Sequence, residues 1–193
     1  AVNYLAGTGG MIAGAAAQIV CYGSNSAAVV AQPDAGAVFH VWSDGRVDSM
    51  RADTNVIAEI TATAVFRSTN GSDLDWYAVR GLAPEGGENW ADVDDRAVPG
   101  KGTTLLHENI ADTDPSDPSD VFRVLAIDPG PPVAVVFTPA STARVYTLQA
   151  GTNLTSGPWI NVQGPRPGTG GADALNDDGT EPARFYRVKV DVP

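Results

Sequence analysis

The residues with the clearest potential for chemistry form an acidic run, DTDPSDPSD, at positions 112–120. Calcium takes about six to eight oxygen ligands, chiefly from carboxylates and backbone carbonyls, and a glutamate lies just before the run. One interpretation is therefore a calcium site. The other is a solvated turn, because Asp-Pro and Ser-Asp-Pro sequences favour tight turns. The carboxylates that would bind calcium are those of Asp112, Asp114, Asp117, Asp120 and Glu108.

A second set of chemical groups lies in VFHVWSDG at 38–45, where His40, Ser43 and Asp44 are close together in the sequence. These are the residue types of a nucleophilic hydrolase. A catalytic triad, however, needs a base that a third group orients, and the only other histidine, His107, lies in a different predicted domain. The Asp-Gly pair is a typical turn former at the end of a strand. We therefore expect a turn here, and no enzyme.

Two further sets of side chains offer other chemistry. Glu85 and Glu88 could be imagined as a glycosidase pair, but such a pair needs two carboxylates that face each other across a cleft at a defined separation. Aromatic rings could instead present a surface to a glycan or a peptide, and core anchoring is the competing interpretation for each ring. The aromatic candidates are Trp42, Trp76, Trp90 and Trp159.

The composition narrows the choice of partners. The formal net charge is −11, and nucleic-acid binding needs the opposite sign, because Lys and Arg must neutralise phosphates. No apolar run reaches the roughly 18–20 residues of a membrane span. We expect no nucleic-acid partner and no membrane insertion. The 21 Gly and 14 Pro, against 12 Lys and Arg, favour a turn-rich β protein.

The single cysteine and the first residue suggest where the protein works. Cys21 is the only cysteine, so no internal disulfide can form. It lies in the strand-like run QIVCYG, which predicts that Cys21 is a small buried hydrophobic residue. The scarcity of cysteine, together with Ala1 in place of Met, is what we expect of an exported chain from which a signal peptide has been removed.

The first third of the chain, residues 1–67, has the pattern of short strands separated by turns that contain Gly or Pro. The most regular strand lies in TNVIAEITATAVFRS, at 54–68. Its alternate residues are apolar at period two, which indicates a strand with one buried face. The residues expected on that face are Val56, Ala58, Ile60, Ala62, Ala64 and Phe66.

This region also carries the motifs of a known family. The strings Y-x-A-G-x-G-G-x-I-x-G, Q-x-V-x-Y-G, A-x-P-x-x-G-x-x-F-x-x-W-S-D-G and R-x-D-x-N-V-x-A-x-I-T-x-T-A-x-F occur in order. Together they resemble the divergent internalin-type B repeat of bacterial surface proteins. The resemblance implies a small β-grasp-like module of extracellular stalks and adhesins, without catalysis. Among the matching positions are Tyr4, Gly9, Gly36, Trp42, Asp44, Arg51 and Asp53.

Residues 68–120 are predicted to be an acidic connecting segment with short helices. Ser72 is the expected N-cap of a helix that stops at Gly81. Another helical turn is expected around Trp90. A third helix, TTLLHENIA, is predicted at 103–111.

The same segment resembles the one that precedes C-terminal modules in many exported bacterial proteins, through W-x-x-x-x-G-L and T-x-x-x-E-x-I-A-D-T-D-P-S-D-P-S-D-V-F-R-V. Such segments often carry a calcium loop of the form D-x-D-x-D-G-x-x-x-x-x-E. If Glu108 is the terminal glutamate, Gly102 is the loop glycine. The three acidic positions then fall on Ala97, Pro99 and Lys101, so the resemblance implies a degenerate loop that has lost its ion.

Residues 121–193 return to strand patterns, in VFRVLAI, PVAVVFTP, ARVYTLQAG, PWINVQG and, at 182–192, PARFYRVKVDV. Short strands at regular spacing with Gly and Pro turns predict a β-sandwich. The run Y-T-L-Q-x-x-x-N-L-T-S-G-x-W-x-x-V-x-G, followed by R-F-Y-R-V-x-V, resembles the immunoglobulin- or fibronectin-like module at the C-terminus of many exported bacterial proteins. Asp177, Asp178 and Glu181 are expected to be loop acids.

The sequence as a whole predicts a mostly β, non-enzymatic, extracellular protein of the bacterial cell surface. Its expected domains are a β-grasp-like repeat domain at 1–67, the acidic segment at 68–120 and a β-sandwich at 121–193. The expected role is a subunit or module of a fibre, assembled through strand edges or head-to-tail contacts with copies of itself or with other surface proteins. The alternative is a module for adhesion or for glycan or peptide binding.

Overall fold

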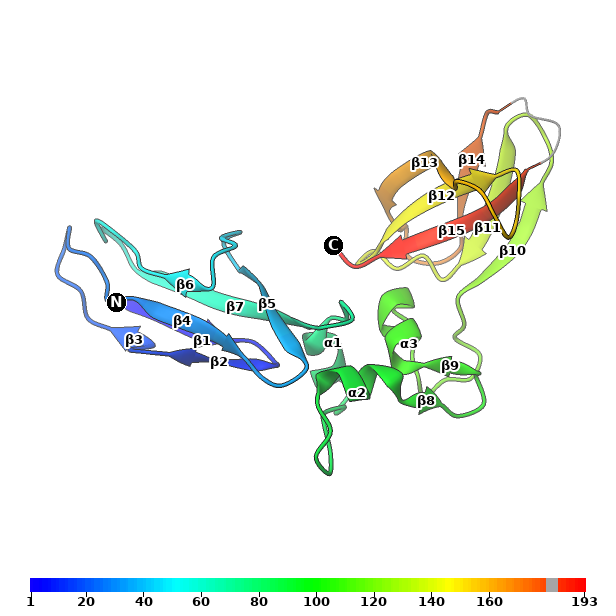
Figure 1. Cartoon of the computed structure of the whole chain (residues 1–193). Helices are drawn as coiled ribbons and strands as arrows, with labels where there is room; N and C mark the ends of the chain where they lie inside the picture. Colours follow the sequence, from blue (N-terminus) through cyan, green and yellow to red (C-terminus); the bar gives the residue numbers. More distant parts are fainter. Residues whose placement is uncertain (180–183) are drawn as a thin grey trace. The chain divides into compact units, whose positions relative to one another are not determined.

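The structure is a computed structural model that describes residues 1–179 and 184–193 (Figure 1). Strands predominate, so the mostly β fold class is confirmed. The chain folds as two compact units, the N-terminal unit Ala1–Arg96 and the C-terminal unit Ala97–Pro193. The segment at 68–120 is divided between them, because its first two helices pack on the N-terminal unit and its third on the C-terminal unit. None of the helices in the described residues is long and apolar enough to span a membrane.

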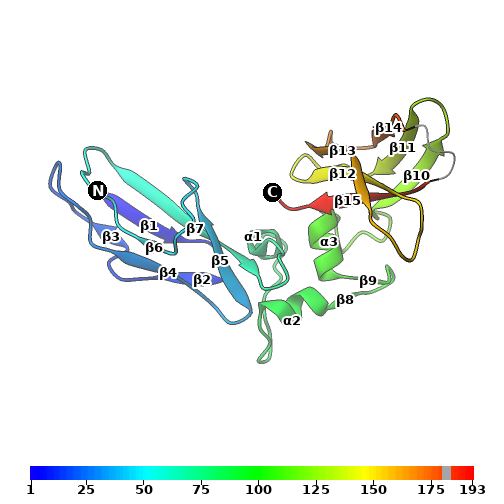
Figure 2. The same ribbon diagram turned by 45° about the horizontal axis from the view of Figure 1, so that its top comes forward.

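The N-terminal unit consists of two sheets (Figures 1 and 2). One sheet has the strand order β3-β1-β7-β5, in which the first and last strands of the unit, β1 and β7, are adjacent and parallel. The other sheet has the order β2-β4-β6. The strands are β1 (Val2–Ala6), β2 (Gly10–Ala13), β3 (Ala17–Gln18), β4 (Val29–Pro33), β5 (Ala37–Trp42), β6 (Met50–Arg51) and β7 (Ile60–Ser68).

The core of this unit is formed by alternate residues of its strands. The predicted buried face of β7 is confirmed at Ala62, Ala64 and Phe66. The strand begins only at Ile60, however, so Val56 is buried from the preceding loop and Ala58 is exposed. The other buried side chains of the unit's strands include Val2, Tyr4, Val29, Ala31 and Trp42.

Two short helices, α1 (Leu74–Ala78) and α2 (Trp90–Asp95), close one end of the N-terminal unit (Figure 2). Asp73, and not the expected Ser72, is the N-cap of α1. The turn at Gly36 has a φ of +74°, and a Cβ there would lie 2.8 Å from the backbone at the start of α2. A glycine is therefore needed at this turn both for its φ and for the close approach of α2.

The C-terminal unit is built from two facing sheets and a short helical segment (Figure 1). In the described residues of this unit the sheets have the orders β10-β11-β14 and β13-β12-β15, and a small hairpin, β8-β9, precedes α3. The elements are β8 (Ala97–Val98), β9 (Thr103–Thr104), α3 (Leu105–Ala111), β10 (Arg123–Asp128), β11 (Val133–Thr138), β12 (Val145–Gly151), β13 (Ile160–Pro167), β14 (Asp173–Asp177) and β15 (Phe185–Asp191).

The core of the sandwich lies between these sheets and is formed by Val135, Phe137, Tyr146, Leu148 and Leu175. The predicted strands at β10 to β13 are present, and β14 was not predicted. The predicted last strand starts at 182–183, which lie outside the described residues, and its described part is β15. Glu181 also lies outside the described residues.

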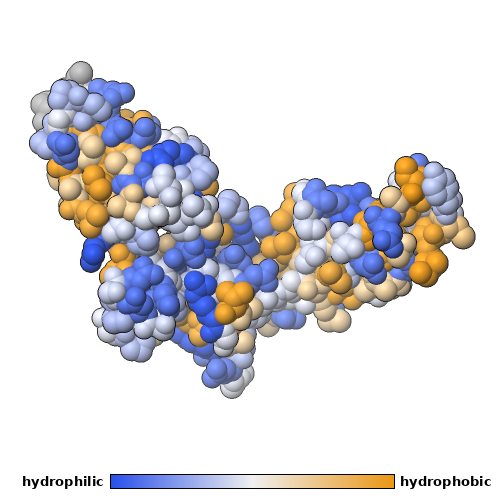
Figure 3. Space-filling view, turned by 180° about the vertical axis from the view of Figure 1, so that it is seen from behind, coloured by the Kyte–Doolittle hydropathy of each residue, from blue (hydrophilic) through white to orange (hydrophobic). Residues whose placement is uncertain are grey.

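The expectation for QIVCYG is wrong. Only its first residue, Gln18, belongs to a strand, and the Cys21 thiol is exposed rather than buried. Residues after Gln18 run beside the loop that precedes β7, where Gly23 and Val56 are joined by a backbone hydrogen bond of 2.9 Å. Because this pairing uses the backbone alone, the side chains are left outside, and Tyr22 is 84% exposed. Hydrophobic residues are visible at this end of the N-terminal unit in Figure 3.

Candidate functional site

The predicted calcium ligand Glu108 is buried, with only 2% of its surface exposed. It lies on α3, which begins after Thr104 and presents Leu105, Glu108 and Asn109 on its buried face. Both oxygens of the Glu108 carboxylate accept hydrogen bonds, from Thr103 Oγ1 to Oε1 and from Thr113 Oγ1 to Oε2. The carboxylate is therefore fully enclosed by the chain.

The cation beside Glu108 is the ammonium group of Lys101. Its Nζ donates to Glu108 Oε2 at 2.7 Å, and only 1% of the Lys101 side chain is exposed. The same Nζ donates to the backbone carbonyl of Asp114 at 2.6 Å and to that of Asp120 at 2.8 Å. One carboxylate and two carbonyls are oxygen ligands of the kind that calcium binds. Here they surround a lysine ammonium, whose three donors they satisfy.

These contacts determine the ionisation of Glu108. Burial alone would raise the pKa of this carboxyl group, but the hydrogen bonds from Lys101, Thr103 and Thr113 outweigh burial, and the pKa is lowered from its ordinary value of 4.5. Glu108 and Lys101 thus form a buried ion pair whose remaining hydrogen-bonding capacity is met by the surrounding chain, as a buried pair requires.

The four aspartates of the acidic run point to separate partners. Asp114 Oδ1 accepts from the N–H and the hydroxyl of Ser116, and Asp117 Oδ1 accepts in the same way from Ser119. These are aspartate-stabilised turns, as the second interpretation of the run proposed. Asp120 Oδ2 accepts from the N–H of Asp114 at 2.8 Å.

The remaining aspartate, Asp112, ends α3 in the left-handed conformation, with a φ of 56°. Its Oδ2 accepts from the Ser141 hydroxyl. Arg144 reaches the same place from the sandwich and donates to the backbone carbonyl of Asn109 at 2.7 Å, which satisfies a carbonyl at the helix end. The C-terminal end of α3, where the acidic run begins, is thereby fixed to the sandwich.

The five predicted ligands are thus neighbours along the chain, but their carboxylates do not converge on one point. Across residues 1–179 and 184–193, no group of three or more His, Cys, Asp or Glu side chains is arranged to hold a metal ion. The residue that the sequence interpretation missed is Lys101. The position of Lys101 could have indicated its role. In the calcium-loop pattern it occupies an acidic position next to the loop glycine, so a positive charge stands where a calcium ligand is expected.

The second candidate, His40, Ser43 and Asp44, is not assembled either. His40 is exposed, and partial desolvation of its ring together with the charge of Arg67 lowers its pKa. Ser43 Oγ accepts from the N–H of Thr63 at 3.0 Å, which stabilises the turn after β5. Asp44 instead accepts from Arg51 Nη1 at 2.9 Å. The motif is a structural turn whose aspartate belongs to an ion pair.

Arg51 is the centre of a buried ion cluster in the N-terminal unit. Its Nε lies 2.9 Å from Asp53 Oδ2, and both side chains are at most 3% exposed. The guanidinium also lies 5.6 Å from the Tyr4 ring centroid and 5.2 Å from that of Trp42, distances typical of cation–π contacts. Tyr4 Oη donates to Asp53 at 2.7 Å. Burial would raise the pKa of Asp53, but Arg51 and Tyr4 lower it from 3.8.

The tryptophans divide into core anchors and one partly exposed ring. Trp42, Trp76 and Trp90 are at most 6% exposed, so the core interpretation holds for them. Trp159 is half-buried, and the Arg187 guanidinium lies 4.4 Å from its ring centroid.

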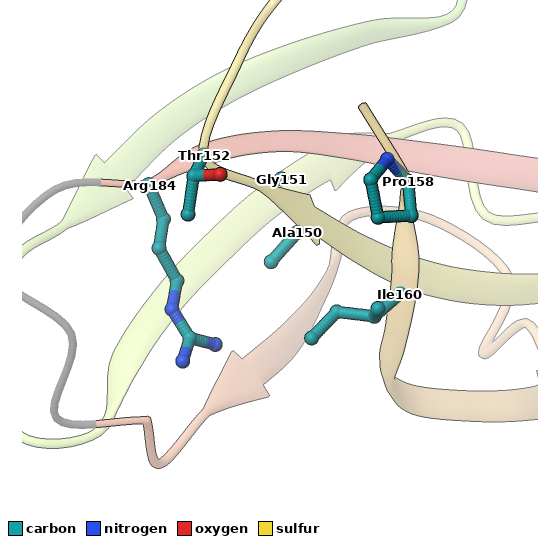
Figure 4. A pocket seen from close by; sticks show the side chains of 6 residues that line it. All are labelled: Ala150, Gly151, Thr152, Pro158, Ile160 and Arg184. Atoms are coloured by element: carbon teal, nitrogen blue, oxygen red, sulfur yellow. The ribbon is translucent and has the colours of Figure 1, made fainter. Parts of the chain in front are cut away.

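A pocket of about 330 Å³ opens in the C-terminal unit, and the residues that line it include Gly151, Pro158 and Ile160 (Figure 4). Its wall is mostly apolar, and Thr152 and Arg184 are the polar residues in it. Arg184 also donates to Asp177, at 2.9 Å. Asp177 is 5% exposed, so it is a buried partner rather than the loop acid that the sequence suggested.

Glu85 and Glu88, the two residues considered as a glycosidase pair, lie close together and contact each other, and Glu88 also contacts Arg96. Glu88 forms an ion pair with Arg96 and accepts from the backbone N–H of Glu85 at 3.1 Å. A different carboxylate is buried between α1 and α2. Asp94 accepts from the Tyr77 hydroxyl at 2.6 Å, and its second oxygen has no partner among the described residues. Burial and the neighbouring Asp94 together raise the pKa of Tyr77 well above its ordinary value.

Comparison with known families bears on the N-terminal unit. Residues 1–70 match a family model described as a divergent InlB B-repeat domain, so the resemblance of the first third is confirmed. No curated protein and no solved structure gives a significant match to the chain. The resemblances of the acidic segment and of the C-terminal module stay predictions.

Proposed function

We propose that the chain is a non-enzymatic structural part of a bacterial surface protein and that it assembles into a fibre through its strand edges. The observation that carries the proposal is the use of its reactive residues. Lys101 and Glu108 bind each other inside the C-terminal unit, and Asp44 binds Arg51 in the N-terminal unit. Groups that hold the fold in this way are withdrawn from substrates.

Two further observations support the same proposal. Residues 1–70 match a repeat domain whose name refers to an internalin, and this repeat type is typical of bacterial surface proteins. Both units are also built from open sheets, whose outer strands present unpaired backbone groups that can pair with another chain. We propose in addition that the chain is extracellular, that it associates with copies of itself and that it catalyses no reaction.

Electron microscopy of the purified chain, with calcium and with a chelator, tests the proposal. We expect regular filaments in both conditions, because Lys101 supplies the positive charge beside Glu108 in the acidic segment. Discrete particles of one chain at every concentration would contradict the fibre role. Filaments that dissolve on chelation would support assembly and would place an ion in the segment.

The pocket lined by Pro158, Ile160 and Arg184 favours the alternative role of a glycan- or peptide-binding module. Concave sites with mostly apolar walls and a few polar groups are common binding sites. A glycan array with the whole chain tests this role, with Ile160→Ala as the variant that should lose binding. An array without any signal for the unchanged chain would eliminate the glycan-binding form of the role.

A further inference from the structure

Strand β10 differs from the other outer strands of the C-terminal unit. It pairs with β11 on one side only, and all six of its residues are exposed. Its apolar side chains are about half exposed, with Val124 at 46%, Leu125 at 49% and Ile127 at 52%. Hydrophobic residues are visible along this edge of the unit in Figure 3. A hydrophobic outer strand of this kind is a ready template for another strand.

The other outer strands of the two facing sheets are protected. The edge of β14 is covered by side chains from β13, since Gln163 accepts from the N–H of Asn176 and Arg166 donates to the carbonyl of Ala174. β13 itself contains Pro165 and Pro167, which cannot donate to a ladder.

The last outer strand, β15, alternates charged with half-buried residues, and α3 packs against it. Prolines, charges and covering elements are the usual ways in which proteins block an edge. Among the described edges of the two facing sheets, β10 lacks a covering side chain or a proline.

The sequence of β10, RVLAID, is complementary to itself when two copies run antiparallel. In that register Arg123 of one copy lies opposite Asp128 of the other, at both ends of the pair. Val124 lies opposite Ile127, and Leu125 and Ala126 lie at the centre. Opposite charges and apolar pairs directly across two strands both stabilise a sheet.

This register depends on the irregularity within β10. A bulge lies between Val124 and Ala126 in the pairing with β11, so Leu125 is the additional residue. Residues directly opposite in an antiparallel pair must turn their backbone groups the same way, which Arg123 and Asp128 would not do in a regular strand. With Leu125 left out of the ladder they do, so that Arg123 meets Asp128 and Val124 meets Ile127. The bulge falls at the two-fold axis, where each copy contributes the same residues.

We propose that β10 is an interface between two copies of this chain, which pair antiparallel along Arg123–Asp128 to join their β10-β11-β14 sheets into one. The occupant is a second copy, because the end charges of the strand complement each other only in such a pair. Arg123 has no ion pair within residues 1–179 and 184–193, and the carboxylate of Asp128 accepts only the nearby N–H of Gly130 there. The contact is small compared with a standard interface, so we expect a weak, concentration-dependent dimer.

This inference specifies one assembly contact of the proposed function and in that sense rests on it. A two-fold pair closes on itself, so a fibre needs a second contact that links such dimers. Sedimentation velocity over a range of concentrations up to the millimolar range tests it, with Arg123→Asp, Asp128→Arg and the double swap as variants. Each single reversal places like charges at both ends of the pair, so we expect at least about a tenfold weaker dimer. The double swap restores opposite charges, and we expect its affinity to return close to the original.

The exposed position of both residues makes these variants suitable, because their folding should be unchanged. Glu59→Arg, at a side chain that is 85% exposed, is the control for the change in net charge that Asp128→Arg introduces. A wild-type chain that stays monomeric, or a dimer that both single reversals leave unchanged, would overturn the interface. Filaments that persist in both single variants would overturn the β10 contact and leave the fibre role intact. A dimer that responds to the charge reversals but forms no filaments would support the β10 contact and contradict the fibre role.

Discussion

Arg51 in the N-terminal unit and Lys101 in the C-terminal unit are both buried cations, but the two units hold them differently. Arg51 binds two carboxylates, those of Asp44 and Asp53, and lies against two aromatic rings. Lys101 binds one carboxylate, that of Glu108, and two backbone carbonyls. The Arg51 site suits the planar guanidinium group of arginine, and the Lys101 site suits the compact ammonium group of lysine.

The difference shows how a charged residue can replace an ion. Backbone carbonyls that converge on a point are the ligands of a metal site, and around Lys101 they converge on the end of a side chain. The backbone carbonyls of Asp114 and Asp120 are held together by this charge. The Arg51 site does not resemble a metal site in this way, because the partners of Arg51 are side chains from separate strands and loops.

Removal of the lysine charge should have the largest effect. Lys101→Met leaves Glu108 buried and unpaired, so we expect the free energy of unfolding of the C-terminal unit to fall by about 3–5 kcal/mol. Urea unfolding of the whole chain measures this. Lys189→Met is the matched control, because Lys189 is 53% exposed and its pair with Asp191 lies at the surface. A loss no larger than that of the control would show that the buried pair is not important for stability.

Removal of the arginine charge should cost less. Arg51→Met leaves Asp53 with two partners, Tyr4 at 2.7 Å and Arg46 at 2.8 Å. We expect a loss of about 2–3 kcal/mol in the N-terminal unit, measured in the same unfolding experiment. A loss larger than that of Lys101→Met would reverse the comparison between the two sites.

Exchange of the two cation types should disturb both sites modestly. Lys101→Arg brings a planar fork into a space formed for a compact ammonium, and Arg51→Lys loses the bidentate and stacked contacts, so we expect about 1–2 kcal/mol for each. Calorimetric unfolding of both variants measures the losses. If either exchange were neutral, that site would depend on charge alone and not on shape.

Acid should weaken both sites gradually. The pKa values of Glu108 and Asp53 are lowered on folding, from 4.5 and 3.8 respectively. Each therefore stabilises its unit above those values, and the contribution is lost as the pH falls through the lower folded pKa. Unfolding measured between neutral pH and about pH 2 should show this loss. Glu108→Gln should flatten the profile of the C-terminal unit, and an unchanged profile would exclude Glu108 as a source of acid sensitivity.

The fold was predictable where the pattern of side chains had a clear period. β7 and β11 were found because apolar residues alternate along them, as at Val135 and Phe137. β2 and β6 are too short to show a period. Cys21 was misplaced because its apolar neighbours pair only through their backbone.

The candidate site was predictable only in outline. The sequence identified Glu108 as a candidate ligand and placed Lys101 at an acidic loop position, but the pairing of the two was not predicted. It could not show that the chain reverses after α3 so that the carbonyls of Asp114 and Asp120 reach Lys101, because carbonyl positions leave no trace in residue types. The Arg51 site was hidden for a similar reason. Asp44, Arg51 and Asp53 are near one another in the sequence, but Tyr4 comes from a distant strand and joins them only in the folded unit.

Calorimetric unfolding of the whole chain, in millimolar calcium and in a chelator, tests most directly whether Lys101 takes the place of an ion. The midpoint of the wild-type C-terminal unit should be the same in both conditions. Lys101→Asp removes the ammonium and adds a carboxylate ligand, so this variant should unfold at a lower temperature in chelator and recover part of the loss in calcium. A wild-type midpoint that rises with calcium would contradict the replacement of the ion by Lys101.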